Sequence, residues 1–119
     1  MGKDYYYLRK TIDYFKERGY EVEKLEKTYR VYDEEKDSVI FVKRDIFCSD
    51  LLAMNENEVI FIQLKTNKSD ISKGIKAYKR MKRPVGRWNI KFWVVSWEKR
   101  KKNPIIVDVD EVLEGEKED

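Results

Sequence analysis

The stretch SDLLAMNENEVIFIQLK, residues 49–65, decides the fold expected of this chain. Two short apolar runs flank the polar segment 55–58, and this pattern predicts two antiparallel strands joined by a turn. Because side chains alternate between faces along a strand, Gln63 and Lys65 are expected to point the same way. Asp50, which begins the first strand, is expected to lie beside them. An acid, an amide and an amine that converge in this way suit a hard metal ion and a water molecule held against a phosphodiester.

The composition narrows the chemistry that the chain can perform. Its 119 residues are expected to form one domain, residues 1–119, with 114–119 as a flexible acidic tail. The chain has no histidine and a single cysteine, Cys48, which excludes histidine-based triads, Cys–His dyads and Cys/His zinc sites. Its five glycines are scattered and form no phosphate-binding loop. An enzyme with this sequence would therefore use carboxylates, lysines, tyrosines and an oxygen-bound metal ion.

The charge of the chain is uneven rather than large. Its 26 basic residues exceed its 23 acidic ones by only three, which by itself does not indicate a nucleic-acid partner. Basic residues predominate between residues 65 and 102, however, and acidic ones predominate in 111–119. This separation predicts one basic face and a solvated acidic end.

Three further features concern where the protein works. It has no run of about twenty apolar residues, so no membrane helix is expected. The first residues lack the apolar segment of a secretory signal, and a lone cysteine fits a reducing compartment. We therefore expect a cytoplasmic protein, of cellular, viral or phage origin. The scarcity of His and Gln beside abundant Lys and Glu is typical of proteins from hot environments.

Apolar periodicity predicts two amphipathic helices, over residues 5–18 and from Ser69 or Asp70 to about residue 82. Gly19 and Pro84 are expected to end them. Their apolar stripes are formed by Tyr5, Leu8, Ile12 and Phe15 in the first helix, and by Ile71, Ile75 and Tyr78 in the second.

Further strands and turns complete the expected fold. The strands are predicted over residues 20–25, 38–42, 88–97 and 104–109, with a turn over 33–37 and a helical turn over 110–116. The strand that contains Trp88, Trp93 and Trp97 is apolar on both alternating sides, which predicts an interior position in a sheet covered on both faces. The predicted fold is therefore α/β, a mixed sheet with helices on its two faces.

The segments RDIFCSDLLA (44–53) and VIFIQLKT (59–66), with the order of the predicted elements, resemble the PD-(D/E)xK nuclease superfamily. Within it, the chain is most similar to archaeal Holliday-junction resolvases and small phage or viral nucleases. The resemblance spans roughly residues 4–109. It implies a restriction-endonuclease-like central mixed sheet with an αβββαβ core. It also implies a homodimeric DNA endonuclease that depends on Mg²⁺ or Mn²⁺ and cuts DNA at a structured or branched site. A simpler endonuclease of duplex DNA, of the restriction or DNA-repair kind, fits the same residues.

The resemblance implies roles for individual residues as well. Asp50, Gln63 and Lys65 are the implied catalytic set, with Asp50, Gln63 and the backbone carbonyl of Leu64 as metal ligands. Ser49 stands where the motif has proline, and Gln63 stands where it usually has an acid, although some active members carry glutamine there. Replacing a carboxylate by an amide removes one negative charge from a metal site, so other oxygen ligands are expected to compensate.

Two acids are candidates for that compensation. Resolvase-like members carry an acid near the start of the first helix, and the matching position lies near Tyr7 or Leu8, where this chain has none. Asp4, one turn upstream, is a candidate substitute. Asp45 would contribute an oxygen if the segment between it and Asp50 folds back.

Six basic residues on and just after the second predicted helix are candidates for binding DNA: Lys73, Lys76, Lys79, Arg80, Lys82 and Arg83. No acid stands between Asp70 and Glu98, which favours a stripe that tracks a phosphate backbone. The solvated side of an ordinary amphipathic helix carries charges too. Such contacts read backbone shape rather than base sequence. The tyrosines at residues 5–7 are candidates for base stacking, for a dimer contact or for packing on the sheet.

Two other functions fit the same sequence. A DNA-binding module that kept the fold and lost the chemistry is favoured by Gln63 and by the missing first-helix acid. A protein-interaction domain would use its charges only for solubility. Taken singly, Asp50, Gln63 and Lys65 are each typical of solvated strand ends, so the nuclease hypothesis depends on their order and spacing together.

Overall fold

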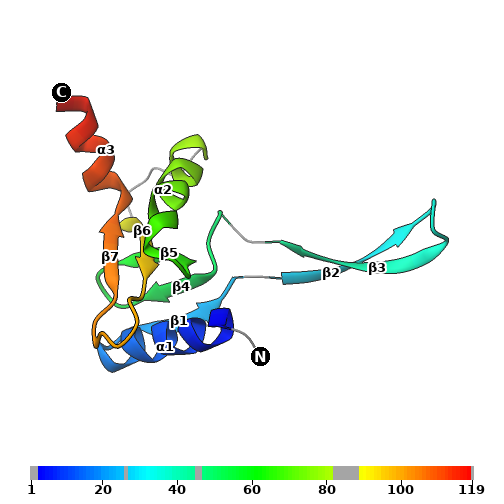
Figure 1. Ribbon diagram of the computed structural model, residues 1–119, viewed down its shortest axis with the longest axis horizontal. Coiled ribbons are helices and arrows are strands. Elements are labelled where there is room, and N and C mark those ends of the chain that lie inside the picture. The colour runs from blue at the N-terminus through cyan, green and yellow to red at the C-terminus, as the bar shows by residue number, and fades with distance from the viewer. Residues whose placement is uncertain (1–2, 26, 45–46, 82–88, 119) are drawn as a thin grey trace.

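The computed structural model describes residues 3–25, 27–44, 47–81 and 89–118. Its elements follow in the order α1 (Lys3–Glu17), β1 (Glu21–Lys24), β2 (Lys27–Asp33), β3 (Ser38–Arg44), β4 (Leu51–Met54), β5 (Val59–Lys65), the short 3₁₀ helix η1 (Lys68–Asp70), α2 (Ile71–Arg80), β6 (Ile90–Ser96), β7 (Ile105–Asp108) and α3 (Val109–Glu118). Its principal extents are 52 × 34 × 32 Å, because β2 and β3 project away from the rest (Figure 1).

Five strands form the main sheet, in the order β1-β4-β5-β6-β7. Strand β4 pairs antiparallel with β1 and with β5, which confirms the hairpin predicted within residues 49–65. Strands β5 and β6 are parallel, with Gln63 beside Val94 and Lys65 beside Ser96, and the segment that contains α2 makes the crossover between them. Strand β7 returns antiparallel to β6. The strand that is apolar on both sides therefore has neighbours on both edges, as predicted.

Helices cover both faces of this sheet, as the sequence predicted (Figure 1). On one face Ile12 and Phe15 of α1 pack against a buried cluster from the sheet, formed by Leu51, Ala53, Ile60, Ile62 and Val95. On the other face α2 and α3 contribute to a second cluster, formed by Tyr78, Phe92, Val94 and Val109. The partly buried Ile71 and Ile75 pack against this cluster, so the inner stripe predicted for α2 is confirmed.

The buried side of α1 differs from its predicted stripe. Tyr5 is 47% exposed, whereas Tyr7 is 6% exposed and Thr11 is fully buried. The Thr11 hydroxyl lies 2.7 Å from the Tyr7 carbonyl, to which it donates, and 2.8 Å from the Trp97 indole nitrogen, from which it accepts. The prediction for Tyr5 was wrong because apolar periodicity gives no weight to a threonine, although this one is buried by satisfying its hydroxyl.

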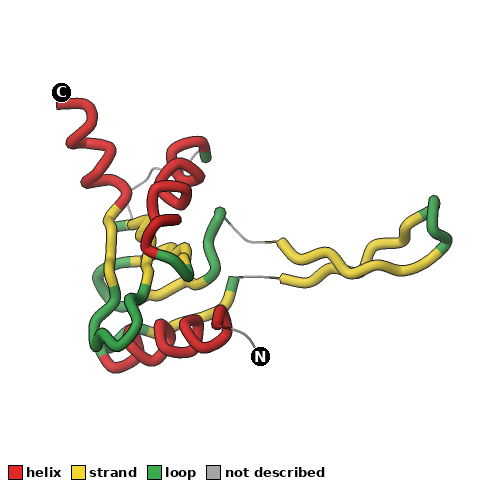
Figure 2. Tube along the Cα trace, in the orientation of Figure 1, coloured by secondary structure: helices red, strands yellow, loops and turns green. Residues whose placement is uncertain are grey.

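Strands β2 and β3 form a separate two-stranded sheet that extends from the body as an arm (Figure 2). They pair antiparallel through seven residues each, and the predicted turn between them is confirmed. No strand was predicted over residues 27–33, whose mostly polar sequence gives little apolar alternation. Three large apolar side chains of the arm are exposed: Val31, Tyr32 and Val39. The arm therefore contributes little to the core.

The remaining predictions concern the C-terminal half. Trp93 and Trp97 belong to the core as expected, whereas Trp88 and Pro84 lie outside the described residues. The carboxylate of Asp108 accepts hydrogen bonds from two backbone amides of the first turn of α3, which caps that helix. Helix α3 runs over Val109–Glu118 and so includes most of the expected acidic tail. Within the described ranges, every helix is too short or too polar to cross a membrane.

Candidate active site

Asp50 lies at the bend that leads into β4. Three hydrogen bonds fix its position, two through its own backbone and one through its carboxylate. Its amide donates to the Ile62 carbonyl at 2.8 Å, and its carbonyl accepts from the Leu25 amide at 2.9 Å. Its carboxylate oxygen Oδ2 accepts from the Leu64 amide at 2.7 Å. The side chain is partly buried. The Asp50 carboxylate is therefore held against β5 at the residue that directly precedes Lys65.

The backbone of Leu64 offers a second oxygen on the same side. The amide and carbonyl of one strand residue point toward the same neighbouring strand. Because the Leu64 amide points to Asp50, its carbonyl is directed to that side as well. Lys65 is the last residue of β5, is half-buried, and has no ion-pair partner in the described part of the chain. An ammonium group at this strand end carries the charge that would attract a phosphate.

Gln63 lies under α2, and none of the residues that the structure describes donates a hydrogen bond to its amide oxygen. It alternates with residues of the α1-side cluster and faces Gly74 of α2, where a Cβ would lie 2.8 Å from its Oε1. That oxygen is buried and accepts no hydrogen bond from any described residue. Buried polar atoms are nearly always paired with protein, water or an ion. This oxygen is therefore suited to contact with a cation or a hydrogen-bond donor.

Ser96 of β6 is a second buried polar group near this place. Its Oγ also accepts no hydrogen bond from the described residues, and it sits beside Lys65 in the parallel register. It alternates with residues of the α1-side cluster, so it lies on the same face as Gln63. On this face Ser49 also pairs with Tyr78 of α2, with their hydroxyl oxygens 2.6 Å apart. Polar groups therefore gather at the end of the α2-side core that lies nearest Lys65.

Gly74 and Ser96 are the residues that the sequence prediction missed. A glycine inside a helix costs roughly 1 kcal/mol relative to alanine, so Gly74 is a signal that something approaches the helix closely there. A serine at the end of an otherwise apolar strand is a weaker signal, because surface serines are common. Neither signal indicates Gln63 as the neighbour without the β5–α2–β6 arrangement.

The structure describes some of the candidate metal ligands and not others. Asp50, Leu64 and Gln63 lie on adjoining strands, whereas Asp45 lies outside the described residues and Asp4 has only its backbone described, in α1. Among the described residues, no group of three or more His, Cys, Asp or Glu side chains is placed to hold a metal ion. Asp50 is thus the one described carboxylate of this donor set, and the remaining donors are amide and backbone oxygens. Such hard oxygen donors fit Mg²⁺ or Mn²⁺ rather than zinc.

The basic residues predicted to follow DNA lie on the solvent side of α2. Those described are all exposed: Lys73, Lys76, Lys79 and Arg80. The Lys73 ammonium lies 3.3 Å from the Asp70 carboxylate at the start of the helix. Lys82 and Arg83 lie outside the described residues. Since Gly74 faces Gln63, the exposed cations lie on the opposite side of α2 from the buried amide.

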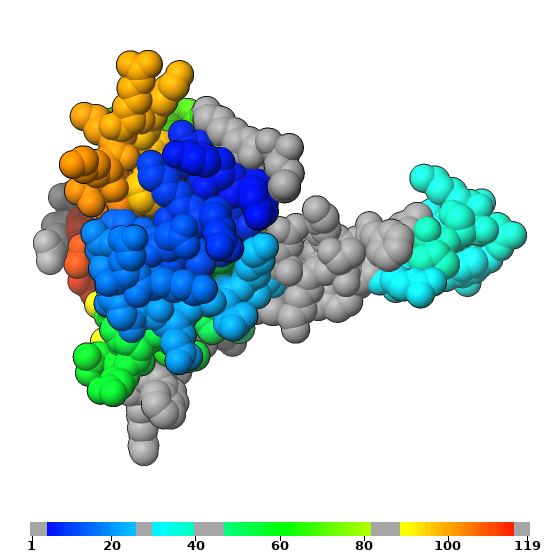
Figure 3. Space-filling view, turned by 90° about the horizontal axis from the view of Figure 1, so that it is seen from below, coloured from blue at the N-terminus to red at the C-terminus, as the bar shows by residue number. Residues whose placement is uncertain are grey.

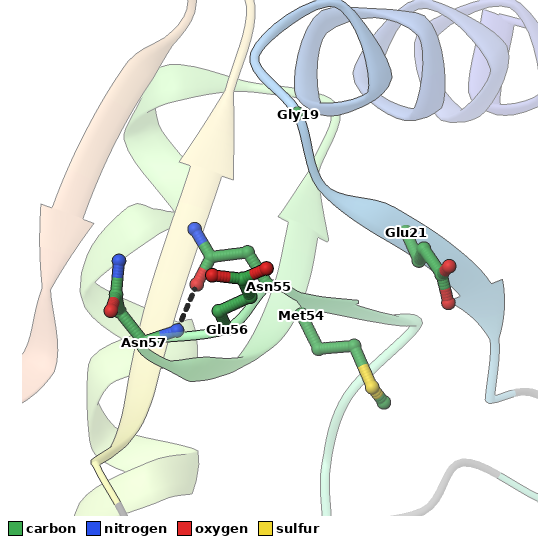
Figure 4. Close-up of a pocket in the computed structure, with 6 residues that line it drawn as sticks. All are labelled: Gly19, Glu21, Met54, Asn55, Glu56 and Asn57. Carbon is green, nitrogen blue, oxygen red and sulfur yellow. Dashed lines mark hydrogen bonds between the residues drawn. The ribbon is translucent and has the colours of Figure 1, made fainter.

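The opposite end of β4 and β5 has a different character. The described residues that line a pocket there are Gly19, Glu21, Met54, Asn55, Glu56 and Asn57, and the charged ones among these six are two carboxylates (Figure 4). Glu58 of the same turn accepts from the Tyr20 hydroxyl and lies 2.8 Å from the Lys91 ammonium. Burial, then the hydrogen bond to the Glu58 carboxylate, raises the pKa of Tyr20 to about 12. The hydrogen bond from Lys91 lowers the pKa of Glu58, which in turn raises that of Lys91.

Comparison of the chain with protein-family models, with curated proteins and with solved structures gave no match. The functional conclusion therefore depends on the residues and geometry of this chain.

Proposed function

We propose that this chain is a metal-dependent DNA endonuclease that selects branched DNA. The observation that carries the proposal is the position of Asp50, whose carboxylate is held by the Leu64 amide beside Lys65 and next to the strand position of Gln63. The order of the elements adds support. Without the β2–β3 arm the chain runs α1, β1, β4, β5, α2, β6, which is the αβββαβ order of a restriction-endonuclease-like core.

The proposed mechanism assigns each residue one task. Asp50, Gln63 and the Leu64 carbonyl would hold Mg²⁺ or Mn²⁺, and the unpaired oxygen of Gln63 fits such a role. The bound ion supplies a more acidic water and stabilises charge on the phosphate. Lys65 orients the attacking water and stabilises negative charge on the pentacovalent transition state. Cleavage by this mechanism leaves a 5′-phosphate and a 3′-hydroxyl. The exposed cations of α2, on the opposite side of that helix from Gln63, would contact the DNA backbone farther from the cut.

The test is cleavage of labelled duplex, single-stranded and four-way-junction DNA with Mn²⁺, with Mg²⁺ and with EDTA. Wild type is expected to cut the junction in either metal and nothing in EDTA. Asp50→Ala and Lys65→Ala should each lower the rate by at least about a hundredfold, in line with the loss of one electrostatic group of a catalytic site. Lys24→Ala, on exposed β1, is the matched control. Cutting that survives Asp50→Ala would refute the site.

A DNA-binding module without catalysis is the second candidate, and one observation favours it. Gln63 replaces a carboxylate, and the described residues contain no cluster of acids that could hold a metal ion. This alternative predicts DNA binding that persists in EDTA, with no cleavage in either metal ion. Gln63→Glu separates the two functions, because restoring the charge should increase cutting only in a protein that already has the chemistry.

We also propose a homodimer, because a four-way junction has two strands to cut at equivalent places and a symmetric enzyme presents two sites. Exposed apolar side chains mark interaction surfaces when they lie together, and the β2–β3 arm exposes Val31, Tyr32 and Val39. We therefore propose the arm as the dimer contact. Sedimentation equilibrium tests this: wild type should have twice the mass of one chain. A monomer at assay concentrations would remove the dimer from the proposal without affecting the catalytic site.

A further inference from the structure

A second pocket lies beside the candidate active site. It is formed by three segments that are distant in sequence: the N-terminal half of α1, residues 66–68 after β5, and residues 97–100 after β6. Figure 3 shows the loop after β6 next to the start of α1 on the surface of the molecule. The segment 66–68 directly follows Lys65. A molecule in this pocket would therefore lie close to the carboxyl end of β5, where the proposed cleavage takes place.

The charge of this pocket is strongly positive. The described residues that line it include one acid, Glu98, and four cations: Lys10, Lys68, Lys99 and Arg100. The Glu98 carboxylate lies 3.2 Å from the Lys68 ammonium and so compensates one cation. Lys99 and Arg100 are exposed and have no ion-pair partner in the part of the chain that the structure describes. The pocket is thus suited to a ligand that carries phosphate.

The pocket also has an aromatic surface of fixed orientation. Tyr6 is 59% exposed, and its ring meets the ring of the buried Tyr7 edge-on, with centroids 5.2 Å apart. The Lys10 ammonium lies 5.7 Å from the centre of the Tyr6 ring and 4.5 Å from the centre of the Trp97 ring. Trp97 is only 4% exposed, so it supports Lys10 from below. Tyr6 is therefore a supported and exposed ring in a pocket that also contains the exposed cations Lys99 and Arg100.

We propose that this pocket binds an unpaired nucleotide of a nucleic-acid strand, with its base stacked on Tyr6 and its phosphate near Lys99 and Arg100. An exposed aromatic ring beside cations is the usual platform for single strands, because every base has a face that can stack. In a duplex the base faces are already stacked on their neighbours. The pocket thus selects strands that leave a duplex, at a fork, a flap or an open junction.

The location of the cut rests on the proposed function, whereas the binding itself does not. An unpaired nucleotide held beside residues 66–68 would place the adjoining phosphodiester near Lys65. This gives the proposed enzyme a physical reason to prefer branched DNA, since an intact duplex has no nucleotide to offer to the pocket.

The binding test uses fluorescence anisotropy in EDTA, with a labelled oligothymidylate of roughly 15 nucleotides and a duplex of equal length. Tyr6→Ala should weaken binding of the single strand by about tenfold and leave the duplex affinity within about twofold. Tyr6→Phe keeps the ring and should bind as wild type does. Tyr5→Ala is the matched control, because Tyr5 is an exposed neighbour on the same helix that does not line the pocket.

Charge is tested with two double variants that each remove two cations. Lys99→Ala/Arg100→Ala should weaken single-strand binding and make it less sensitive to salt, whereas Lys24→Ala/Lys36→Ala should do neither. Oligouridylate bound as well as oligothymidylate would support a site that reads base and phosphate. Binding of oligouridylate that is more than tenfold tighter would overturn DNA as the ligand.

Three results would overturn the inference: equal single-strand affinity of Tyr6→Ala and Tyr5→Ala, tighter binding of the duplex than of the single strand by wild type, or no binding of either. The far-ultraviolet circular dichroism and thermal midpoint of each variant verify that it is folded. Because the assay contains EDTA, a chain that cuts nothing refutes the proposed function and leaves the Tyr6 result intact. Equal cutting of branched DNA by wild type and Tyr6→Ala would refute the role of the pocket in placing the cut, whereas the binding itself is decided by the anisotropy assay.

Discussion

Two hairpins follow one another along this chain, and one lies outside the hydrophobic core whereas the other forms part of it. The β2–β3 hairpin pairs over seven residues of each strand, projects from the body and exposes Val31 and Val39. The β4–β5 hairpin pairs over four residues, lies inside the sheet and buries Ile60 and Ile62 completely. The longer hairpin is thus the one outside the core. Pairing alone does not stabilise a ribbon in water, because a two-stranded sheet has no neighbours to bury its faces.

The site follows from the same difference. The β4–β5 hairpin has β1 and β6 on its edges and helices on its faces, so the strand ends that carry Asp50 and Lys65 are held in place. The arm offers no such support. Among the described residues, the side-chain hydrogen bonds of its turn, residues 34–37, are local: two backbone amides donate to Asp33, and the Tyr32 hydroxyl donates to the Asp37 carboxylate. The side chains of the candidate site are therefore held in fixed positions by the β4–β5 hairpin, which is packed on both edges and both faces.

The largest expected effect is a difference in stability between matched truncations in the two hairpins. Ile62→Ala should lower the free energy of unfolding by about 2–5 kcal/mol, because it leaves a cavity in a fully buried position. Val39→Ala, at a side chain that is 46% exposed, should change it by less than about 0.5 kcal/mol. Urea unfolding followed by circular dichroism measures both. Equal losses would mean that the arm is part of the core, for example within a dimer.

A smaller effect is expected from the unpaired oxygen of Gln63. Gln63→Met keeps the length of the side chain and removes the buried acceptor, so it should raise the free energy of unfolding by about 1 kcal/mol in EDTA. Gln63→Glu should lower it, because a carboxylate would be buried at the same place. A destabilising Gln63→Met would show that the oxygen already has a partner in the folded protein.

Substitutions at Gly74 and Gln63 should have non-additive effects on the free energy of unfolding, with an interaction energy of about 0.5 kcal/mol or more. Alanine at a helix interior is favoured over glycine by roughly 1 kcal/mol, but a Cβ at Gly74 would lie 2.8 Å from Gln63 Oε1 and 3.1 Å from two Val94 methyl groups. Gly74→Ala should therefore stabilise the Gln63→Ala protein more than the wild type. Additive effects in a double-mutant cycle would place the amide elsewhere.

The smallest expected effect concerns pH and the far end of the β4–β5 hairpin. Tyr20 has a folded pKa of about 12 against 10.0 for the free side chain, and the pKa of Lys91 is raised as well. The contribution of Tyr20 to stability is complete below pH 10 and is lost as the pH rises toward 12, because the unfolded chain releases this proton first. The contribution of Lys91 is likewise lost at alkaline pH. Glu58 acts oppositely: its pKa is lowered below 4.5, so its contribution is lost at acid pH.

Urea unfolding between pH 8 and about pH 11.5 tests this assignment. Stability should fall more steeply with pH in the wild type than in Tyr20→Phe, which has no phenol to ionise. Tyr14→Phe, another tyrosine of the α1 side, is the control and should follow the wild type. Identical slopes for Tyr20→Phe and wild type would rule out the Tyr20–Glu58 contact.

The sequence predicted the elements whose burial repeats with a regular period. The alternation in residues 49–65 predicted the β4–β5 hairpin, and the two apolar faces of the strand around Trp93 predicted its interior position in the sheet. It did not predict strand β2, because a projecting ribbon needs no apolar face. It wrongly placed Tyr5 in the core. Apolar periodicity could not show that Thr11 takes a buried position of α1, because Thr11 is buried through hydrogen bonds and not through an apolar side chain.

The candidate site was predictable only in part, for a related reason. Asp50 and Lys65 follow from strand spacing, and the 2.7 Å contact between Asp50 and the Leu64 amide agrees with that spacing. The burial of Gln63 beneath Gly74 depends on how α2 crosses the sheet, which no local pattern encodes. The pocket at Tyr6 joins three segments that are far apart in sequence, so only the folded chain brings them together.

The most direct test of the account is to locate a divalent cation on the folded protein. Nitrogen-15-labelled protein titrated with Mn²⁺, which broadens nearby amide signals, should lose the signals of Leu64 and Lys65 first, and Asp50→Asn should abolish that selectivity. A metal site at Asp50 would be contradicted if the first signals lost were those of Glu21 and Glu56, in the acidic pocket at the other end of the hairpin, or if Asp50→Asn behaved as wild type does.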